Sequence, residues 1–368
     1  MPSVSQEDAD ATRAAAQSGD TKKEVKLTYE ERYPTDVMLT EKEYAIGEQM
    51  HRPMPAIDVV TELNVNATAA APREPSSLPP DEAARLRATG DLCGVTTYFN
   101  PAKYPNKYEN MKLFYDRVGR GQGLYVLAVE LTFTTKSSEV HGDMDSSFEL
   151  RAGRDADQVV HLTTSPTNTL WQKERMLNIA VERLPERCTK VAWIDADSFF
   201  TNERWVSETS ALLEEYVVVQ PFAYLVRLPP EVNWIDPANI KVTTLASSKQ
   251  ASEVVALTQL YRSAGFVRVM HGRNAQKNFL LSNDDGNSGH TGIAWCARRS
   301  FLAELKLYDK LIIGGGDNLF FQSIIGVFKK SLRENLSVHI RHQIESWASS
   351  VYNATKGSFG YTDGLAYT

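Results

Sequence analysis

Short apolar segments alternate with helix-like segments along residues 92 to 228. The helix-like segments repeat their apolar residues every three or four positions, whereas the others are short apolar runs bounded by turn residues. This alternation predicts an α/β fold, with a mostly parallel sheet and helices on both faces. Ligands of such sheets bind beyond the carboxyl ends of the strands, where the strand order reverses. We expect strands at 92–100, 123–133, 158–165, 190–200 and 216–228, and helices at 106–120, 168–184 and 202–216.

The 368 residues are expected to divide into three parts. Residues 1–28 are small and polar with almost no large apolar side chains, which predicts a disordered tail. Residues 29–90 form an N-terminal extension with sparse apolar positions, and its Pro- and Ala-rich segment 66–82 is typical of a linker. Residues 91–368 carry the strand and helix pattern, so we expect a single α/β domain there.

The net charge of −6 excludes a generally basic surface of the kind that coats nucleic acids. A local basic groove remains compatible with it. The stretch 265–279 concentrates Arg268, His271, Arg273 and Lys277, which could contact phosphates. A mixed surface loop is the alternative interpretation, and the residues alone favour it slightly.

Cys93, Cys188 and Cys296 are far apart and each lies beside apolar residues. We therefore expect buried free thiols and a reducing compartment. No N-terminal signal segment and no apolar run of about 18 residues or more occurs, so no membrane span is expected. A nuclear location fits these features. The Golgi or endoplasmic reticulum lumen is the alternative, if a membrane anchor belongs to the protein.

Two carboxylates end an otherwise apolar strand in "KVAWIDADSFF", residues 190 to 200. Residues i and i+2 of an extended chain point to the same side, so Asp195 and Asp197 aim at one spot. Carboxylate oxygens completed by phosphate or water are the ligands that Mg²⁺ and Mn²⁺ prefer. The pair therefore predicts a divalent-cation site. The alternative is that one acid caps the helix expected at 202–216.

Residues at the end of the first strand should face the same crevice as this acidic pair. Thr96, Thr97 and Tyr98 occupy that position, and we expect them to contact a bound nucleotide. Lys173 and Arg175, on the helix before the acidic strand, are the cations expected near the nucleotide. The alternative for both is a solvated charge on a helix surface.

Three glycines, Gly314, Gly315 and Gly316, directly precede Asp317 at the start of another expected helix. Glycines let the backbone pass close to a ligand, and a carboxylate at a helix N-terminus is well placed electrostatically. Asp317 is therefore a candidate general base, with Gly315 and Gly316 beside the ligand. A simple helix cap is the competing interpretation.

The segment "LSVHIRHQIESW", residues 336–347, has the alternation of a strand and contains His339 and His342. A single histidine is usually structural. Together with an acidic pair, however, an imidazole nitrogen suits Mn²⁺, so His342 is a candidate third metal ligand.

The order of these motifs resembles the metal-dependent inverting glycosyltransferases of the GT-A fold, and most closely the C-terminal half of the β-1,4-galactosyltransferases. The resemblance implies that Asp195 and Asp197 match the Asp-x-Asp motif, that Asp317 matches the base of the "WGGEDD" segment, and that His342 matches the histidine of an "IRH" metal ligand. Two positions depart from the pattern: Gly316 replaces the glutamate before the base, and Asn318 replaces the acid after it. These departures put the galactosyltransferase sugar and acceptor preference in doubt.

A narrower resemblance covers residues 92–368. The segments "VTTYFNP", "LWQKERMLNIAVERLP", "KVAWIDADSFFTNERW" and "LYDKLIIGGGD" are similar to a group of soluble glycosyltransferases of bacteria, phages and kinetoplastids. That group includes the base J glucosyltransferases, which add glucose to 5-hydroxymethyluracil in DNA. The resemblance implies a UDP-sugar donor, UDP-glucose above all, with Mn²⁺ or Mg²⁺, and DNA containing hydroxymethyluracil as the acceptor.

Two other functions stay open on the sequence. One is a glycosyltransferase that builds a protein- or lipid-linked glycan, similar to the galactosyltransferases. The other is a nonenzymatic module that binds a nucleotide or metal, for which a glycine-rich turn ending in Asp317 would be an unnecessary feature.

Overall fold

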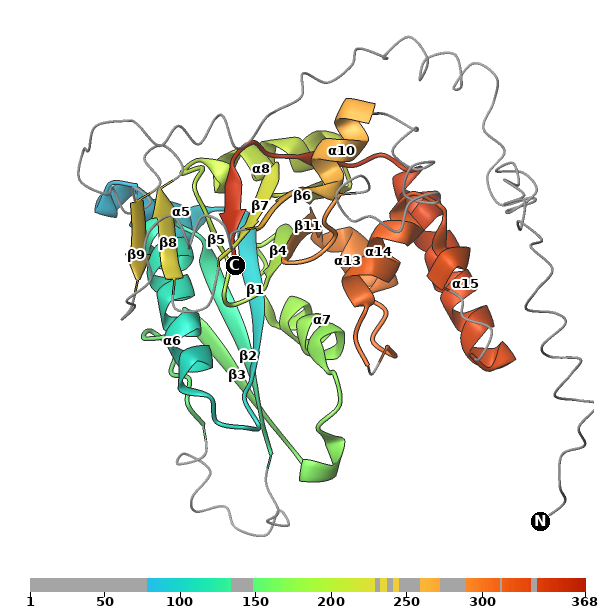
Figure 1. Ribbon diagram of the computed structural model, residues 1–368, viewed down its shortest axis with the longest axis horizontal. Helices are drawn as coiled ribbons and strands as arrows, with labels where there is room; N and C mark the ends of the chain where they lie inside the picture. Colours follow the sequence, from blue (N-terminus) through green and yellow to red (C-terminus); the bar gives the residue numbers. More distant parts are fainter. Residues whose placement is uncertain are drawn as a thin grey trace, which may run out of the picture. The chain divides into compact units, whose positions relative to one another are not determined.

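A computed structural model describes residues 78–133, 148–228, 232–236, 241–244, 259–271, 289–311, 313–331 and 336–368 (Figure 1). The expected disordered tail, 1–28, and most of the N-terminal extension, 29–77, lie outside the described residues. So do residues 272–279 of the basic stretch.

A seven-stranded sheet forms the centre of the fold, with the strand order β12-β6-β11-β4-β1-β2-β3. Neighbouring pairs β3–β2, β2–β1, β1–β4 and β6–β12 are parallel, and only β11 runs antiparallel to its neighbours. The predicted α/β class with a mostly parallel sheet is therefore confirmed. The strands are β1 (Leu92–Phe99), β2 (Tyr125–Phe133), β3 (Gln158–Thr164), β4 (Lys190–Ile194), β6 (Val218–Gln220), β11 (Ala294–Arg298) and β12 (Gly360–Tyr361).

The strand order reverses between β1 and β4. The chain adds β2 and then β3 on one side of β1, and β4 returns to pair with the other side of β1. The carboxyl ends of β1 and β4 therefore flank the place where such sheets bind ligands. Thr96 ties the two strands together there, since its hydroxyl donates to the carbonyl of Ile194 at 2.7 Å.

Helices and a long π-helical segment cover the sheet. The helices are α5 (Pro80–Thr89), α6 (Pro105–Phe114), α7 (Lys173–Arg183), α8 (Trp205–Glu215), α10 (Ala264–His271), α13 (Arg299–Leu305), α14 (Gly316–Ile324) and α15 (Val338–Thr355), and the π-helical segment is Tyr115–Gly121. Figure 1 shows α6 on one side of the first strands and α7 on the other. Helix α5 begins within the segment expected to be a linker.

Alternating side chains of the strands pack on these two layers, because successive residues of a strand point to opposite faces. Ala192 and Ile194 belong to the core that includes Phe114 and Trp205. The residue between them, Trp193, instead meets the ring of Phe320 in α14, with centroids 5.3 Å apart. Burial on both faces explains why these strands are uniformly apolar.

Residues 336–347 were expected to form a strand, and this prediction is wrong. Helix α15 begins at Val338, where the hydroxyl of Ser337 accepts the amide hydrogen of Ile340 at 3.3 Å. Its buried residues, Ile344, Ala348 and Val351, repeat every three or four positions. This spacing places one stripe of the helix in the core, where it contacts α14.

The strand that follows the acidic pair belongs to a second sheet. Its strand order is β10-β7-β13-β5, and it comprises β5 (Phe199–Phe200), β7 (Tyr224–Arg227), β10 (Gln259–Arg262) and the C-terminal strand β13 (Leu365–Tyr367). Phe199 stacks on Tyr367 with ring centroids 5.3 Å apart. The C-terminus thus holds the strand that follows Asp197. A separate antiparallel pair joins β8 (Val232–Asp236) to β9 (Lys241–Thr244).

Cys93 and Cys188 form a disulfide, which contradicts the prediction that all three cysteines are free thiols. Cys93 lies on β1 and Cys188 lies just before β4, and both are fully buried. Their distance of 95 residues in sequence hid the pairing, which depends on β1 and β4 being neighbours. Cys296 is a buried free thiol, as predicted.

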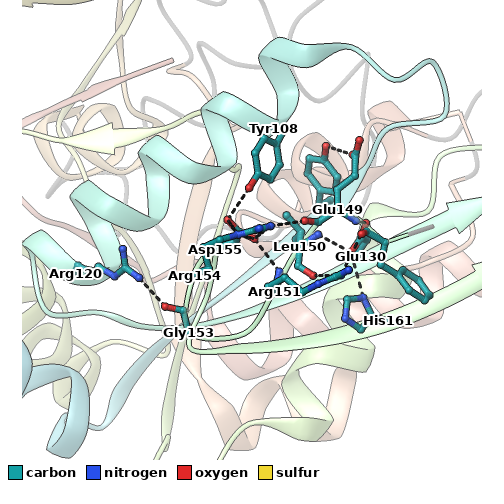
Figure 2. Close-up of polar contacts among 12 residues, drawn as sticks. Tyr108, Arg120, Glu130, Glu149, Leu150, Arg151, Gly153, Arg154, Asp155 and His161 are labelled. Atoms are coloured by element: carbon teal, nitrogen blue, oxygen red, sulfur yellow. Dashed lines mark hydrogen bonds and ion pairs between the residues drawn. The ribbon is translucent and has the colours of Figure 1, made fainter. Parts of the chain in front are cut away.

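A polar network beside β2 and β3 fixes the segment that follows residue 147 (Figure 2). The buried carboxylate of Glu130 accepts the amide hydrogens of Glu149 and Leu150 at 2.7 and 3.1 Å, and contacts His161 at 3.2 Å. Glu149 in turn accepts the hydroxyl hydrogen of Tyr98. The network therefore orients a residue at the carboxyl end of β1. None of the described helices is long and apolar enough to span a membrane.

Candidate functional site

A pocket of about 200 Å³ lies where the strand order reverses, and we call it the switch-point pocket. Its walls come from the carboxyl end of β1, from the start of α7 and from the segment after β4. The side chains that matter below are Thr97, Tyr98, Phe99, Trp171, Lys173, Asp195 and Asp197. The crevice predicted from the strand pattern is thus present, and it contains the acidic pair.

The backbone after β4 presents the two acids to this pocket. The amide of Asp195 donates to the carbonyl of Ile293 at 2.8 Å, and Ser198 closes the turn by donating to the carbonyl of Asp195 at 3.1 Å. Ile293 has φ of +70°, an unfavourable conformation for a β-branched residue. Such strain persists where surrounding structure enforces it, and here it accompanies the backbone contact that fixes Asp195.

Asp317 occupies the first turn of α14. Gly314 and Gly315 precede it with φ of +90° and +95°, a region that favours glycine. Helix α14 is anchored by Phe320, whose ring packs at 5.3 Å from Trp193 of β4 and 5.6 Å from Trp295 of β11. These aromatic contacts bring Asp317 to the end of β4, although it lies 120 positions after Asp197 in the sequence.

Lys173, the first residue of α7, forms ion pairs with Asp195 and Asp317. Its Nζ lies 2.6 Å from Oδ1 of Asp195 and 3.0 Å from Oδ2 of Asp317. The lysine is only 7% exposed. Burial alone would lower the pKa of Lys173, but the two carboxylates outweigh burial and raise the pKa above its ordinary value. Lys173 therefore stays an ammonium. Lys173 lines the switch-point pocket, and its expected place near a nucleotide stays a prediction. Its contacts with both acids were not foreseen.

The acidic pair is held in a setting that disfavours its charge. Loss of water raises the pKa of Asp195, Lys173 lowers it, and Asp317 raises it again, so that the pKa is raised. Desolvation also raises the pKa of Asp197, with a further contribution from Asp195. Yet the side chain of Asp195 is 34% exposed and Asp197 is exposed, so both carboxylates remain accessible to a ligand. A bound cation would relieve this mutual repulsion.

Glu174 is a buried acid beside Lys173 that the sequence did not reveal. It is buried, and a Cβ added at Gly316 would lie 2.1 Å from its Oε1, so glycine is needed where α14 begins. Burial raises the pKa of Glu174, and Asp317 adds to the rise. A Lys-Glu pair at the start of a polar helix resembles ordinary surface charge. Only the packing of α14 buries it.

Two other predicted residues lie away from the pocket. Thr96 is fully buried and braces β1 against β4 instead of lining the pocket. Arg175 is exposed, lies 3.4 Å from Asp309 and borders a different hollow with Thr163. Lys173 lines the pocket and Arg175 does not, because residues two apart on a helix point in different directions.

His342 lies on α15 and is exposed. Its Nδ1 is 3.6 Å from Glu345, one turn along the same helix. It borders a pocket with His339, Tyr308 and Trp347, to which none of the acids of the switch-point pocket contributes. The predicted ligand set requires His342 to lie beside Asp195 and Asp197. The structure does not bring His342 together with these two acids.

The donor set of the switch-point pocket fits Mg²⁺ or Mn²⁺ only with help from a substrate. Within the described parts of the chain, no group of three or more His, Cys, Asp or Glu residues could hold a metal. Asp197 and the second oxygen of Asp195 are the available carboxylate ligands. Mg²⁺ is commonly bound by one or two carboxylates plus substrate phosphates, so a diphosphate would complete the shell.

Part of the basic stretch is described. Arg268, on α10, donates to the carbonyl of Gly357 at 3.1 Å, so this guanidinium braces the fold near the C-terminus. Arg273 and Lys277 lie outside the described residues.

No protein-family model and no curated protein matches the chain. Among solved structures it is similar to 4-diphosphocytidyl-2C-methyl-D-erythritol synthase from Anaerococcus prevotii (10% identity, 76% of this chain and 89% of that one, TM-score 0.29). It is also similar to mannosyl-3-phosphoglycerate synthase from Rubrobacter xylanophilus (15% identity, 74% of this chain and 77% of that one, TM-score 0.30). A third similar structure is mannose-1-phosphate geranyltransferase from Thermus thermophilus (10% identity, 76% of this chain and 73% of that one, TM-score 0.27). At such TM-scores these similarities carry no argument about function.

Proposed function

We propose that the protein is a metal-dependent inverting glycosyltransferase that takes the sugar of a UDP-sugar. UDP-glucose is the proposed donor and 5-hydroxymethyluracil in DNA the proposed acceptor. The observation that carries the proposal is that Lys173 joins Asp195 to Asp317 at the carboxyl ends of β1 and β4, where Asp195 and Asp197 line one pocket. This is where a doubly wound sheet binds a nucleotide, and where transfer would need both a diphosphate site and a base.

The walls of the switch-point pocket supply the contacts that a nucleotide diphosphate needs. Thr97 and Tyr98 line the pocket at the end of β1, with the hydroxyl of Thr97 as the polar group, and Lys107 adds a cation. Asp197 and Asp195 would hold Mg²⁺ or Mn²⁺. When bound, the ion would act as a Lewis acid that stabilises charge on the departing diphosphate.

Asp317 would accept the proton of the acceptor hydroxyl. The hydroxyl oxygen then forms a bond to the anomeric carbon, and the bond from that carbon to the diphosphate oxygen breaks. UDP leaves with the electron pair, and the single displacement inverts the anomeric centre. Lys173 would keep Asp317 oriented, because its Nζ contacts Oδ2 at 3.0 Å, while Oδ1 would remain for the hydroxyl.

The choice of glucose and of DNA as acceptor rests on the resemblance of residues 92–368 to the group that includes the base J glucosyltransferases. A modified pyrimidine in duplex DNA must be flipped out or reached through the major groove. DNA binding of this kind would weaken steeply with added salt, since phosphate contacts release counterions.

A glycosyltransferase that builds a protein- or lipid-linked glycan is the second candidate, and the disulfide between Cys93 and Cys188 favours it. Disulfides persist in oxidising compartments such as the secretory pathway and are rare in the nucleus. The same site chemistry would serve either acceptor.

The test is to incubate the wild-type protein with Mn²⁺ and a panel of nucleotide sugars. Each sugar is paired with a hydroxymethyluracil oligonucleotide, an unmodified oligonucleotide or a simple glycoside. We expect UDP release only with UDP-glucose and hydroxymethyluracil DNA. Turnover with the glycoside alone would transfer the proposal to the glycan-building enzyme. An absence of turnover with every pair would refute glycosyl transfer.

A further inference from the structure

Trp171 is an exposed aromatic residue at the edge of the switch-point pocket. It is 40% exposed, whereas Trp193 and Phe320, which pack between β4 and α14, are each 3% exposed. Isolated apolar side chains on a surface need no explanation. A tryptophan that lines the same pocket as Lys173, Asp195 and Asp197 is different, because a ligand in that pocket would lie beside it.

The indole ring is fixed from two directions. The ring of Phe99 meets it edge to face, with centroids 6.0 Å apart and an interplanar angle of 85°. The carboxylate of Glu174 is the second neighbour, since Trp171 lowers the pKa of that carboxyl. A ring already packed against Phe99 loses less conformational entropy when a ligand stacks on it.

Trp171 also lies beside the turn that carries the proposed base. A Cβ added at Gly314 would be 4.0 Å from Cδ2 of the indole, and Gly314 precedes Asp317 by three residues. Two residues after Trp171, the ammonium of Lys173 contacts Asp317 directly. The indole is therefore connected to the base through both chain segments.

We propose that Trp171 is the acceptor platform, on which the ring that bears the accepting hydroxyl stacks so that the hydroxyl reaches Asp317. This inference rests on the proposed glycosyl transfer. The required ligand chemistry is a flat ring face. A pyrimidine provides it through its π system and a pyranose through its C–H face, so the two acceptor sources are separate arms of the test.

The experiment compares wild type with Trp171→Ala, Trp171→Phe and Leu170→Ala. Leu170 is the matched control, because it is an equally exposed neighbour that does not line the pocket. For each protein, the acceptor KM is measured with a hydroxymethyluracil oligonucleotide and with methyl glucoside. The Kd of UDP with Mn²⁺ is measured by calorimetry.

We expect Trp171→Ala to raise the acceptor KM about tenfold in whichever arm is active, since stacking on one aromatic ring contributes about 1–3 kcal/mol. The rise in KM should exceed any change in the Kd of UDP. Trp171→Phe retains a stacking face and should recover most of the affinity, which also guards against a folding defect in the alanine variant. Leu170→Ala should match wild type.

An unchanged acceptor KM in Trp171→Ala would overturn the inference, as would a loss confined to the Kd of UDP, which would make Trp171 part of the donor site. Both results can be obtained only if the wild-type protein is active, so neither of them contradicts the proposed glycosyl transfer. If wild type turns over no donor in either arm, the proposed function fails and the inference fails with it.

Discussion

Lys173 Nζ lies 2.6 Å from Asp195 Oδ1 and 3.0 Å from Asp317 Oδ2, so a single buried ammonium joins the end of β4 to the start of α14. The two carboxylates come from segments more than a hundred residues apart. Without the lysine, two acids would face each other in a partly desolvated pocket. The lysine is therefore a structural element of the site as well as a charge within it.

Lys173→Met should lower the free energy of unfolding by about 3 kcal/mol at pH 7, because removing one partner of a buried ion pair leaves charge uncompensated. The free energy is measured by urea denaturation. Lys306→Met is the control. Lys306 lies 2.8 Å from Glu182, but both side chains are 55% exposed, so its loss should cost about 1 kcal/mol or less. Adding Asp317→Asn to Lys173→Met should restore part of the stability. Equal losses in the two lysine variants would argue against a buried bridge.

Asp197→Asn should weaken Mn²⁺-dependent binding of UDP by at least about tenfold, since even partners outside the first metal shell contribute about 10- to 100-fold to metal affinity. Chelation of the metal should weaken UDP binding to wild type and leave little further effect of the variant. Calorimetry with and without Mn²⁺ measures both. Asp116→Asn, an exposed acid paired with Arg120 away from the pocket, is the control. Unaltered Mn²⁺-dependent affinity in Asp197→Asn would contradict the metal assignment.

Glu174→Gln should stabilise the protein at neutral pH. Burial first, and then Asp317, raise the pKa of Glu174 above its ordinary 4.5. The folded state therefore binds this proton more tightly than the unfolded chain, and the stability linked to it is lost as pH rises through the folded pKa. The melting temperature of the variant should exceed that of wild type at pH 8, with a gap that closes toward pH 4.5.

Glu182→Gln provides the control of opposite sign. A hydrogen bond from Lys306 lowers the pKa of Glu182, so its contribution to stability is present at neutral pH and lost as pH falls through the folded pKa. Because this pair is exposed, the effect should be small. A gap between Glu174→Gln and wild type that widens toward acidic pH would refute a raised pKa of Glu174.

The disulfide should make stability depend on reducing agent. Closing a loop of 95 residues contributes about 5 kcal/mol in the chain-entropy account, so dithiothreitol should lower the stability of wild type by up to that amount. A Cys93→Ala, Cys188→Ala double variant should already be less stable and should not respond to the reductant. Thiol titration of the unfolded, unreduced protein should find one thiol, Cys296. Three thiols would show that the bond is absent.

The alternation of strands and helices was sufficient to predict the parallel sheet, because each segment of 92–228 reports its own local period. The acidic pair could be placed at the switch-point pocket because it directly follows a buried strand. Asp317 was singled out by the glycines before it, and its role stays a prediction.

The prediction of a strand at residues 336–347 was wrong for a local reason. The order Val338, His339, Ile340, Arg341 alternates as a strand does, and the helical stripe becomes visible only further along, at Ile344, Ala348 and Val351. The capping role of Ser337 was the overlooked signal.

Other features could not be read from sequence because they depend on contacts between distant segments. The burial of Lys173 and Glu174 requires α14 to pack on α7 and β4. The disulfide requires β1 and β4 to be neighbours. No periodicity within 168–184 distinguishes a charge that will meet two acids from one that will meet solvent.

The most direct measurement of the central claim compares wild type with Asp317→Asn in a single assay with UDP-glucose, Mn²⁺ and hydroxymethyluracil DNA, together with the Kd of UDP. General-base catalysis contributes about 10²- to 10⁴-fold. We predict that Asp317→Asn loses turnover by a factor in that range while the Kd of UDP changes little. Asp309→Asn, an acid that pairs with Arg175 outside the switch-point pocket, should behave as wild type. Turnover by Asp317→Asn at the wild-type rate would contradict the account.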